Sequence, residues 1–392
     1  MNILVVTLFY YIEGRPDLIH NTNAVHYLAK YWAKEHNVTV FNVYAHSYHA
    51  AKRYFSHESR EYYRNGYAFE KDKVRVHLTE VQKYPGQKGK YNSVQTAHIM
   101  KQFRQMISKT DEEPDVIVVH FPSYAVSFID EIRSCFNKRI PAVAVMHKTD
   151  AEELEHGRVS PDLFDAQYDA IFSRSLGIYK RVSKFHLKNL KPELILSGIP
   201  KQSPDKQVPI ESKKEFKVIY VGKLIKRKHP EVVIQAIADI PDISLDIVGA
   251  GELEQKLRKM VVDLGVSERV NFLGTMSREE VIQSMAEAQM FCMPSVDETL
   301  GLTYLEAMSV GCVPIGTQDE GIDGVIINGQ NGFLVNRASM QQDVEKYISE
   351  YMGMEMSQRR MIAENAIETA AKMDEETCSM KYLELIKRSM SL

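Results

Sequence analysis

Short apolar runs alternate with longer amphipathic stretches along almost the whole chain. Two series of strands are predicted: Ile3–Leu8, Val38–Asn42, Val116–His120, Ala142–His147 and Ala170–Ser173, then Lys217–Val221, Ser244–Val248, Val270–Leu273, Met290–Met293 and Val313–Gly316. Most of these runs are apolar on both faces, which is typical of parallel strands covered by helices on both sides. Helical patterns lie between them at Ala24–Glu35, Glu231–Ile240, Glu252–Leu264 and Arg278–Ala286. The alternation predicts a doubly wound α/β architecture and not an antiparallel sandwich.

The alternation breaks over Leu190–Phe216, where several prolines stand among Lys, Ser and Asp residues. This composition is typical of a linker. A length of 392 residues indicates two or three domains. We therefore expect two Rossmann-like domains, spanning residues 1–200 and 201–392. The last helical pattern, Met380–Arg388, is expected either to close the second domain or to cross back to the first.

The amino-acid composition excludes several classes of protein. Hydrophobic residues make up 44% and charged residues 26%, as in ordinary globular proteins. A net charge of −3 argues against a general nucleic-acid binder. No run approaches the ~20 apolar residues of a membrane span, and the first apolar run reads as a buried strand and not as a signal peptide. The four scattered cysteines favour a reducing, cytoplasmic location.

The densest chemical signal is the stretch Ser295–Pro314, with the sequence SVDETLGLTYLEAMSVGCVP. A polar loop follows a predicted strand, and a helix is expected to begin around Gly301 and to end at Gly311. Glycine lets a ligand approach the backbone closely, and the free N–H groups of a first helical turn favour an anion such as phosphate. Glu298 and Glu306 flank that turn, so the pattern suits a diphosphate between two polyols. Solvated glutamates are the alternative for either residue alone.

A second signal is the basic loop Gly222–His229, with the sequence GKLIKRKH, before a helix that Pro230 opens. In open α/β sheets, ligands bind at the carboxyl ends of the strands. Lys223 and Lys228 are therefore placed to neutralise a diphosphate. A solvated surface is the preferred interpretation for the two other basic residues of the loop, Lys226 and Arg227.

Together these motifs resemble the nucleotide-binding domain of the retaining GT-B glycosyltransferases of family 4. That family has a Glu–x7–Glu pair, a strand followed by Gly-Arg-Leu and a downstream Lys, and a Gly-x-Gly before a helix. The matching segments are Glu298 with Glu306, Gly222–Leu224 with Lys228, and Gly249–Gly251, and Val270–Gly274 resembles the strand against which the base packs. The resemblance is close over Phe216–Leu392 and loose before it.

The resemblance implies a GT-B fold and transfer of a sugar from a nucleotide-diphosphate-sugar to an acceptor hydroxyl, with retention at the anomeric carbon. Lys223 and Lys228 would hold the diphosphate, Glu298 the donor sugar and Glu306 the ribose. The residues implied for catalysis are His120, Lys223, Lys228 and Glu298, and those implied for nucleotide-sugar binding are Gly14, Gly222, Gly249, Leu273, Leu300, Gly301, Leu302 and Glu306. Two residues depart from the family pattern: Lys223 replaces an Arg, which loses a bidentate fork, and Leu300 replaces a common Phe.

The N-terminal half matches the family less explicitly. Tyr11–Pro16 stands where the family often has a Gly-rich loop, and it retains one glycine, Gly14. His120 ends a predicted strand in the sequence His-Phe-Pro, which resembles the family's His-x-Pro near the donor sugar. A structural strand-end histidine is the alternative. His147 and Arg174 end the next two strands, and surface or structural roles compete there with contacts to substrate.

The motifs that are missing bear on the mechanism. The chain has no Asp-x-Asp, which argues against a metal-dependent GT-A transferase, and no Walker loop. We expect no metal and no cofactor, because lysines and helix N–H groups would stabilise the leaving diphosphate. The expected partners are a UDP- or GDP-linked sugar donor and an acceptor glycan, lipid-linked sugar or small molecule. The alternatives are a nucleotide-sugar 2-epimerase of related fold and a catalytically silent nucleotide-sugar-binding protein.

Two basic stretches, Lys88–Lys109 and Ile178–Lys191, carry apolar residues at helical spacing. Such helices are compatible with peripheral contact to an anionic membrane. Ordinary surface helices of an α/β domain are the preferred interpretation.

Overall fold

The computed structural model describes residues 1–15, 18, 23–46, 57–84, 87, 90–110, 112–213 and 215–390. The chain divides into two compact units. The first unit comprises Met1–Arg174, Ile178–Ile195 and Cys378–Leu392, and the second comprises Ser175–Gly177 and Leu196–Thr377. Lys88, in the first basic stretch, and Pro16, in the loop that carries Gly14, lie outside the described residues.

The described residues of the first unit form a sheet in the order β3-β4-β2-β1-β5-β6-β7-β8. Its strands are β1 (Asn2–Thr7), β2 (Asn37–His46), β3 (Tyr67–Lys71), β4 (Val74–Gln82), β5 (Val116–His120), β6 (Ala142–Met146), β7 (Ala170–Ser173) and β8 (Pro192–Leu194). Every pair of neighbours is parallel except β3 and β4. The helices are α1 (His26–Trp32), α2 (His57–Asn65), α3 (Ser93–Ile107), α4 (Pro122–Ala125), α5 (Ile129–Arg133), α6 (Lys148–Glu155), α7 (Pro161–Gln167), α8 (Leu176–Val182) and α15 (Glu375–Met390).

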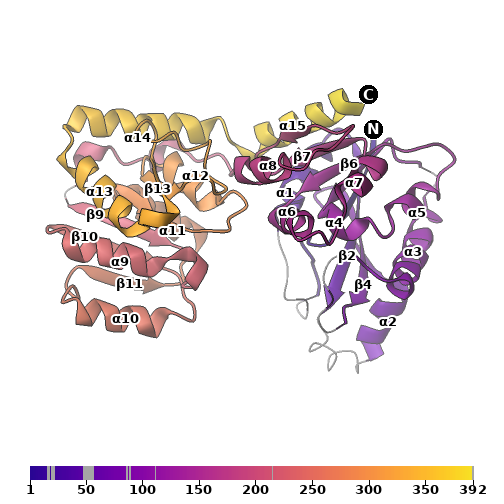
Figure 1. The fold of residues 1–392 in the computed structure, drawn as a ribbon, viewed down its shortest axis with the longest axis horizontal. Helices are drawn as coiled ribbons and strands as arrows, with labels where there is room; N and C mark the ends of the chain where they lie inside the picture. Colours follow the sequence, from indigo (N-terminus) through magenta and orange to yellow (C-terminus); the bar gives the residue numbers. More distant parts are fainter. Residues whose placement is uncertain are drawn as a thin grey trace. The chain divides into compact units, whose positions relative to one another are not determined.

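Both faces of this sheet are buried. Successive side chains of a strand point to opposite faces, so Leu4 and Val6 join one hydrophobic cluster while Ile3 and Val5 join another. The second cluster includes three side chains of α15: Tyr382, Leu383 and Ile386. The C-terminal helix, yellow in Figure 1, therefore packs among the indigo and magenta elements of the first unit.

The second unit contains a parallel sheet in the order β11-β10-β9-β12-β13-β14. Its strands are β9 (Phe216–Val221), β10 (Ile243–Val248), β11 (Val270–Gly274), β12 (Met290–Cys292), β13 (Val313–Thr317) and β14 (Phe333–Val335). The helices are α9 (Pro230–Asp239), α10 (Glu254–Asp263), α11 (Arg278–Glu287), α12 (Leu302–Ser309), α13 (Met340–Gly353) and α14 (Met356–Ala371). Since all strands run in one direction, their carboxyl ends and the loops that follow them share one edge of the sheet.

The order of the second sheet reverses at β9. This strand pairs with β10 on one side and with β12 on the other. A crevice at the carboxyl ends of such neighbouring strands is where ligands bind in open α/β sheets. The loops after β9 and β12, which carry the two densest sequence motifs, therefore meet at the switch point of this sheet.

The predicted α/β class with two largely parallel sheets is confirmed. The antiparallel β3–β4 pair was not predicted, and the sequence pattern also missed β8 and β14. Within the described residues, no helix combines the length and the apolar character needed to cross a membrane.

Candidate nucleotide-sugar site

The loop after β9 places four basic residues at the switch point of the second sheet. A short 3-10 turn, Lys226–Lys228, leads to His229, whose positive φ of 49° ends the turn and caps α9. Pro230 occupies the first turn of α9, as the sequence predicts. The loop backbone is fixed, because the Tyr220 hydroxyl donates to the carbonyl of Lys223 at 3.1 Å.

Two glycines let the loop after β10 pack directly on the loop after β9. A Cβ at Gly249 would lie 2.0 Å from the carbonyl oxygen of Gly222, and a Cβ at Gly251 would lie 2.4 Å from that of Leu224. The N–H of Leu224 in turn donates to the carbonyl of Ala250 at 3.0 Å. The Gly-x-Gly sequence is therefore explained by backbone packing that shapes the basic loop. Nucleotide contact by Gly222 or Gly249 stays a prediction.

Glu298 and the basic loop form a compact ion cluster. One carboxylate oxygen, Oε1, lies 2.6 Å from Nζ of Lys228 and 2.5 Å from a guanidinium nitrogen of Arg227. The side chains of Glu298 and Lys228 are 14% and 12% exposed, so this charge pair is largely removed from water. Burial lowers the pKa of Lys228, although Glu298 opposes that shift. Arg227 is exposed on the surface, as expected, and its guanidinium also binds Glu298.

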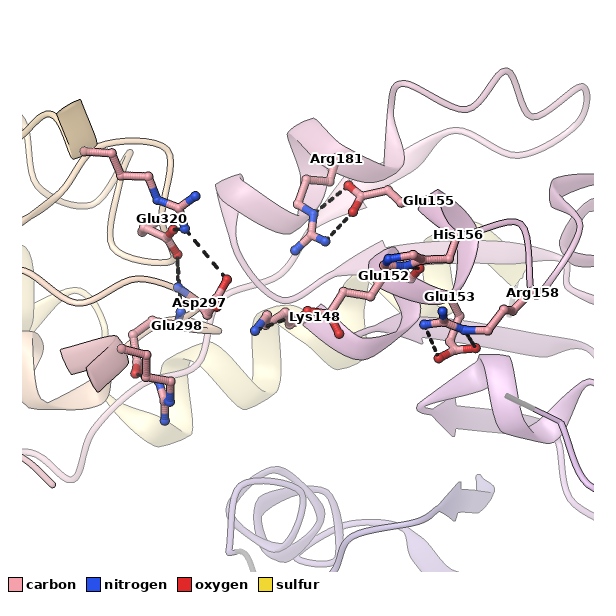
Figure 2. Close-up of polar contacts among 12 residues, drawn as sticks. Lys148, Glu152, Glu153, Glu155, His156, Arg158, Arg181, Asp297, Glu298 and Glu320 are labelled. Atoms are coloured by element: carbon pink, nitrogen blue, oxygen red, sulfur yellow. Dashed lines mark hydrogen bonds and ion pairs between the residues drawn. The ribbon is translucent and has the colours of Figure 1, made fainter. Parts of the chain in front are cut away.

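The loop that carries Glu298 is held by a buried acid that the sequence analysis did not single out. The Glu320 carboxylate accepts hydrogen bonds from the backbone N–H groups of Asp297 (2.8 Å) and Glu298 (3.3 Å). Arg337 pairs with the other oxygen of Glu320 at 2.7 Å. Figure 2 shows Glu320 turned toward the backbone of this loop. The backbone that carries the Glu298 side chain is therefore held in place by these hydrogen bonds.

The first turn of α12 lies at the same edge of the sheet. Gly301 caps the helix with a φ of 79°, and a Cβ there would lie 2.7 Å from the ring of Tyr304. The Tyr304 hydroxyl donates to the carbonyl of Met293 at the end of β12, which ties the helix start to the strand end. The first N–H groups of a helix have no intrahelical acceptor, and a glycine cap offers no side chain to them. The helix start expected near Gly301 is confirmed, and its geometry suits an anion.

Glu306, on α12, pairs with a residue that the sequence analysis did not single out. Its Oε1 lies 2.6 Å from a guanidinium nitrogen of Arg278, the first residue of α11. The Glu306 side chain is 14% exposed and that of Arg278 is 42% exposed. Burial raises the pKa of Glu306, and the Arg278 charge opposes that rise. Arg278 follows the carboxyl end of β11, so the strand-end rule that selected Lys223 would also have found it.

The remaining predicted residues of this unit have different exposures. Lys223 is exposed on the loop after β9, and Leu273 is 43% exposed at the end of β11. Leu300 is buried beneath the start of α12, whereas Leu302 is partly exposed. An exposed leucine at a strand end is an apolar surface on which a base can stack. Each predicted role of these four residues stays a prediction.

In the first unit, the loop after β1 holds Gly14 in a conformation with a φ of 74°. A Cβ there would lie 2.5 Å from the hydroxyl oxygen of Tyr67. Next to it, the buried Arg15 pairs with Glu80 at 2.7 Å. The glycine is thus required by local packing, and its proposed contact with donor stays a prediction.

His120 ends β5, fully buried within the first unit. Its Nδ1 lies 3.1 Å from Nε2 of His147, and the ring of His147 stacks on Phe121 with centroids 3.8 Å apart. Burial lowers the pKa of both histidines well below the usual range, and the Arg174 charge adds to the effect. The three strand-end residues His120, His147 and Arg174 are therefore buried, and the two histidines form a neutral pair.

No group of three or more His, Cys, Asp or Glu side chains with the spacing of a metal site occurs within the described part of the chain.

Residues 201–369 match the family model described as Glycosyl transferases group 1. The matched residues lie within the second unit, Leu196–Thr377. A lipopolysaccharide core biosynthesis glycosyltransferase of Rhizobium meliloti is 30% identical over 173 residues, which cover 43% of this chain and 49% of that protein. The matches span less than two thirds of each of the first curated relatives, at 49%, 66% and 42% of their lengths.

Solved structures similar to the whole chain show its fold. The sucrose-phosphate synthase of Thermosynechococcus elongatus aligns over 100% of both chains with a TM-score of 0.69 and 16% identity. The Anabaena protein HepE, solved in complex with UDP, aligns over 99% of this chain and 100% of its own with a TM-score of 0.68 and 18% identity. The predicted GT-B fold, with two Rossmann-like domains, is confirmed.

Proposed function

We propose that this protein is a retaining, metal-independent glycosyltransferase that moves a sugar from a nucleotide-diphosphate-sugar to an acceptor hydroxyl. One observation carries the proposal. Lys228, Arg227 and Glu298 cluster beside the start of α12, at the switch point of the sheet in the glycosyltransferase domain. This arrangement combines two cations, an acidic hydrogen-bond acceptor and a helix N-terminus at one edge.

The cluster is suited to a diphosphate leaving group. The partly desolvated Lys228 ammonium pairs with Glu298, and a second anion would improve its environment. The N–H groups at the start of α12 add fixed partial positive charge. Charges that are positioned before the reaction stabilise a developing phosphate charge without reorganisation, which is the role that a metal ion has in other transferases. Glu298 would then accept hydroxyl groups of the donor sugar.

Glu306 and Arg278 extend this site toward the nucleoside. A buried carboxylate is a strong acceptor for the two hydroxyls of a ribose, and Arg278 keeps it charged. HepE binds UDP, and it has also been solved with UDP-glucose. These complexes favour UDP over GDP as the nucleotide of the donor.

In the proposed reaction, the acceptor hydroxyl attacks the anomeric carbon from the face that the diphosphate leaves. The bond from the anomeric carbon to the diphosphate oxygen breaks as the bond to the acceptor oxygen forms, and the departing phosphate takes the acceptor proton. No carboxylate of the chain is assigned as a covalent nucleophile. The acceptor is proposed to be a glycan, a lipid-linked sugar or a small molecule.

A ligand screen followed by an activity assay tests the proposal. UDP or GDP should raise the melting temperature, because a ligand that binds the native state stabilises it. The matching nucleotide-sugar should then be hydrolysed slowly to free sugar and nucleoside diphosphate. Binding without hydrolysis would favour a silent binding protein, and conversion of the donor sugar to its 2-epimer would favour the epimerase. No stabilisation by any nucleotide would contradict the proposal.

A further inference from the structure

A half-buried lysine without a carboxylate partner lies at the carboxyl edge of the sheet in the first unit. Lys83 directly follows β4, and its ammonium lies 4.3 Å above the centroid of the Tyr124 ring. Among the residues that the structure describes, no carboxylate forms an ion pair with this ammonium. Burial lowers the pKa of Lys83, so the charged group has lost part of its water.

The backbone on both sides of this contact is fixed. The N–H of Lys83 donates to the carbonyl of His46 at 2.9 Å, which continues the pairing of β4 with β2. Tyr124 lies in α4, and the Ser127 hydroxyl donates to its carbonyl at 2.9 Å. The ammonium and the phenol ring therefore belong to two segments with fixed backbones, which follow β4 and β5 of the same sheet.

Two acids whose charges act on this pair already have donors of their own. Glu153, whose charge acts on Lys83, is bound by both arms of the Arg158 guanidinium at 2.7 and 2.9 Å. Figure 2 shows Glu153 facing Arg158. Asp150, which acts on Tyr124, accepts the backbone N–H groups of His147 (2.8 Å) and Ser123 (3.0 Å). The positive charge of Lys83 is therefore available to an anion from outside the chain.

We propose that Lys83 and Tyr124 form an oxyanion subsite that binds a phosphate or carboxylate group carried by the acceptor. The role of this subsite in sugar transfer rests on the proposed function. The cations assigned to the donor diphosphate, Arg227 and Lys228, belong to the second unit, whereas Lys83 and Tyr124 belong to the first. A charge-assisted hydrogen bond from the ammonium to an oxyanion is roughly twice as strong as a neutral one, and the ring beneath the ammonium holds it in place.

Calorimetric titration with three probes tests the subsite: glucose 6-phosphate, glucuronate and neutral glucose. Glucose 6-phosphate or glucuronate should bind, and the tighter of the two identifies the preferred oxyanion, whereas glucose should not bind at the same concentration. Lys83→Ala should weaken the binding about tenfold or more, as expected for the loss of a charged hydrogen bond. Lys83→Arg, which keeps the charge above the ring, should retain most of it. Lys101→Ala, an exposed lysine on α3, is the matched control and should bind normally.

The same preparations separate this proposal from the proposed function. UDP should bind Lys83→Ala as it binds the wild type, and unchanged melting temperatures would show that the variants are folded. Unaltered glucose 6-phosphate binding by Lys83→Ala would overturn the subsite. If Lys228→Ala lost glucose 6-phosphate binding while Lys83→Ala kept it, the sugar phosphate would lie at the nucleotide site. That result would also overturn the subsite. Absence of UDP binding with normal oxyanion binding would instead remove the proposed donor site and leave the Lys83 subsite standing.

Discussion

Replacement of Arg278 by alanine should make nucleotide binding sensitive to pH. The Glu306 carboxylate is 14% exposed, and its pKa is already raised by burial while Arg278 at 2.6 Å holds it down. Without the guanidinium, the pKa of Glu306 rises further. If the Glu306 carboxylate binds the ribose, protonation weakens nucleotide binding, because the protonated acid is a poorer hydrogen-bond acceptor. As the pH falls, the variant should therefore lose affinity for the nucleotide before the wild type does.

The size of the effect follows from the exposure of the two partners. Breaking a fully buried ion pair costs about 3–5 kcal/mol, and an exposed pair is worth about 0.2–1 kcal/mol. With Arg278 42% exposed, an intermediate coupling of about 1.5–2 kcal/mol is appropriate. By linkage, this coupling limits the ratio of wild-type to variant affinity to roughly 10- to 30-fold at low pH. At high pH, where Glu306 is ionised in both proteins, the ratio should approach one.

Calorimetric titration of UDP between about pH 5.5 and pH 8.5 measures this ratio. The phosphate of UDP titrates equally with every variant, so it cancels in the comparison. Arg278→Lys should restore most of the wild-type profile, and Glu306→Gln should bind weakly at every pH. Arg360→Ala, which removes another partly exposed arginine paired with a glutamate in the same unit, is the control. Parallel pH profiles for the wild type and Arg278→Ala would refute the reasoning.

Three further outcomes are expected. Lys228→Ala should lower turnover by on the order of 10²-fold, because one preorganised charge on the leaving diphosphate is lost, and near-normal turnover in the folded variant would remove Lys228 from the site. Activity should survive excess EDTA, and an activity lost to EDTA and restored by Mn²⁺ or Mg²⁺ would contradict the metal-free mechanism. His120→Ala should slow transfer and leave nucleotide affinity unchanged, if the His-x-Pro resemblance holds. A lower melting temperature with normal turnover would instead assign this buried histidine a structural role.

The strands were predictable where both faces of a parallel strand are buried. The runs Val116–His120 and Ala170–Ser173 coincide with β5 and β7, because an unbroken apolar run bounded by polar residues marks a strand between two helical layers. The β3–β4 pair was not predicted, because β3 has no fully buried residue and β4 begins with alternating buried and half-buried residues. β8 and β14 have three residues each, too few for a periodic signal.

The candidate site was predictable where residues stand next to one another in the sequence. The loop after β9 and the start of α12 follow strand ends, so their positions come from the α/β pattern together with the capping glycine and proline. The contacts of Glu320 with the loop of Glu298 are made across the sheet edge, which no local spacing encodes, whereas Arg278 follows a strand end and could have been found by the rule that selected Lys223. The ion pair of Arg227 with Glu298 could not be predicted either, because the two residues are 71 positions apart.

A crystal structure of the protein with UDP tests the central claim most directly. We predict that the diphosphate lies at the start of α12 beside Gly301, within hydrogen-bond distance of Lys228, and that the ribose hydroxyls contact Glu306. Bound UDP at any other place in the second unit, or a diphosphate held away from Lys228, would contradict it.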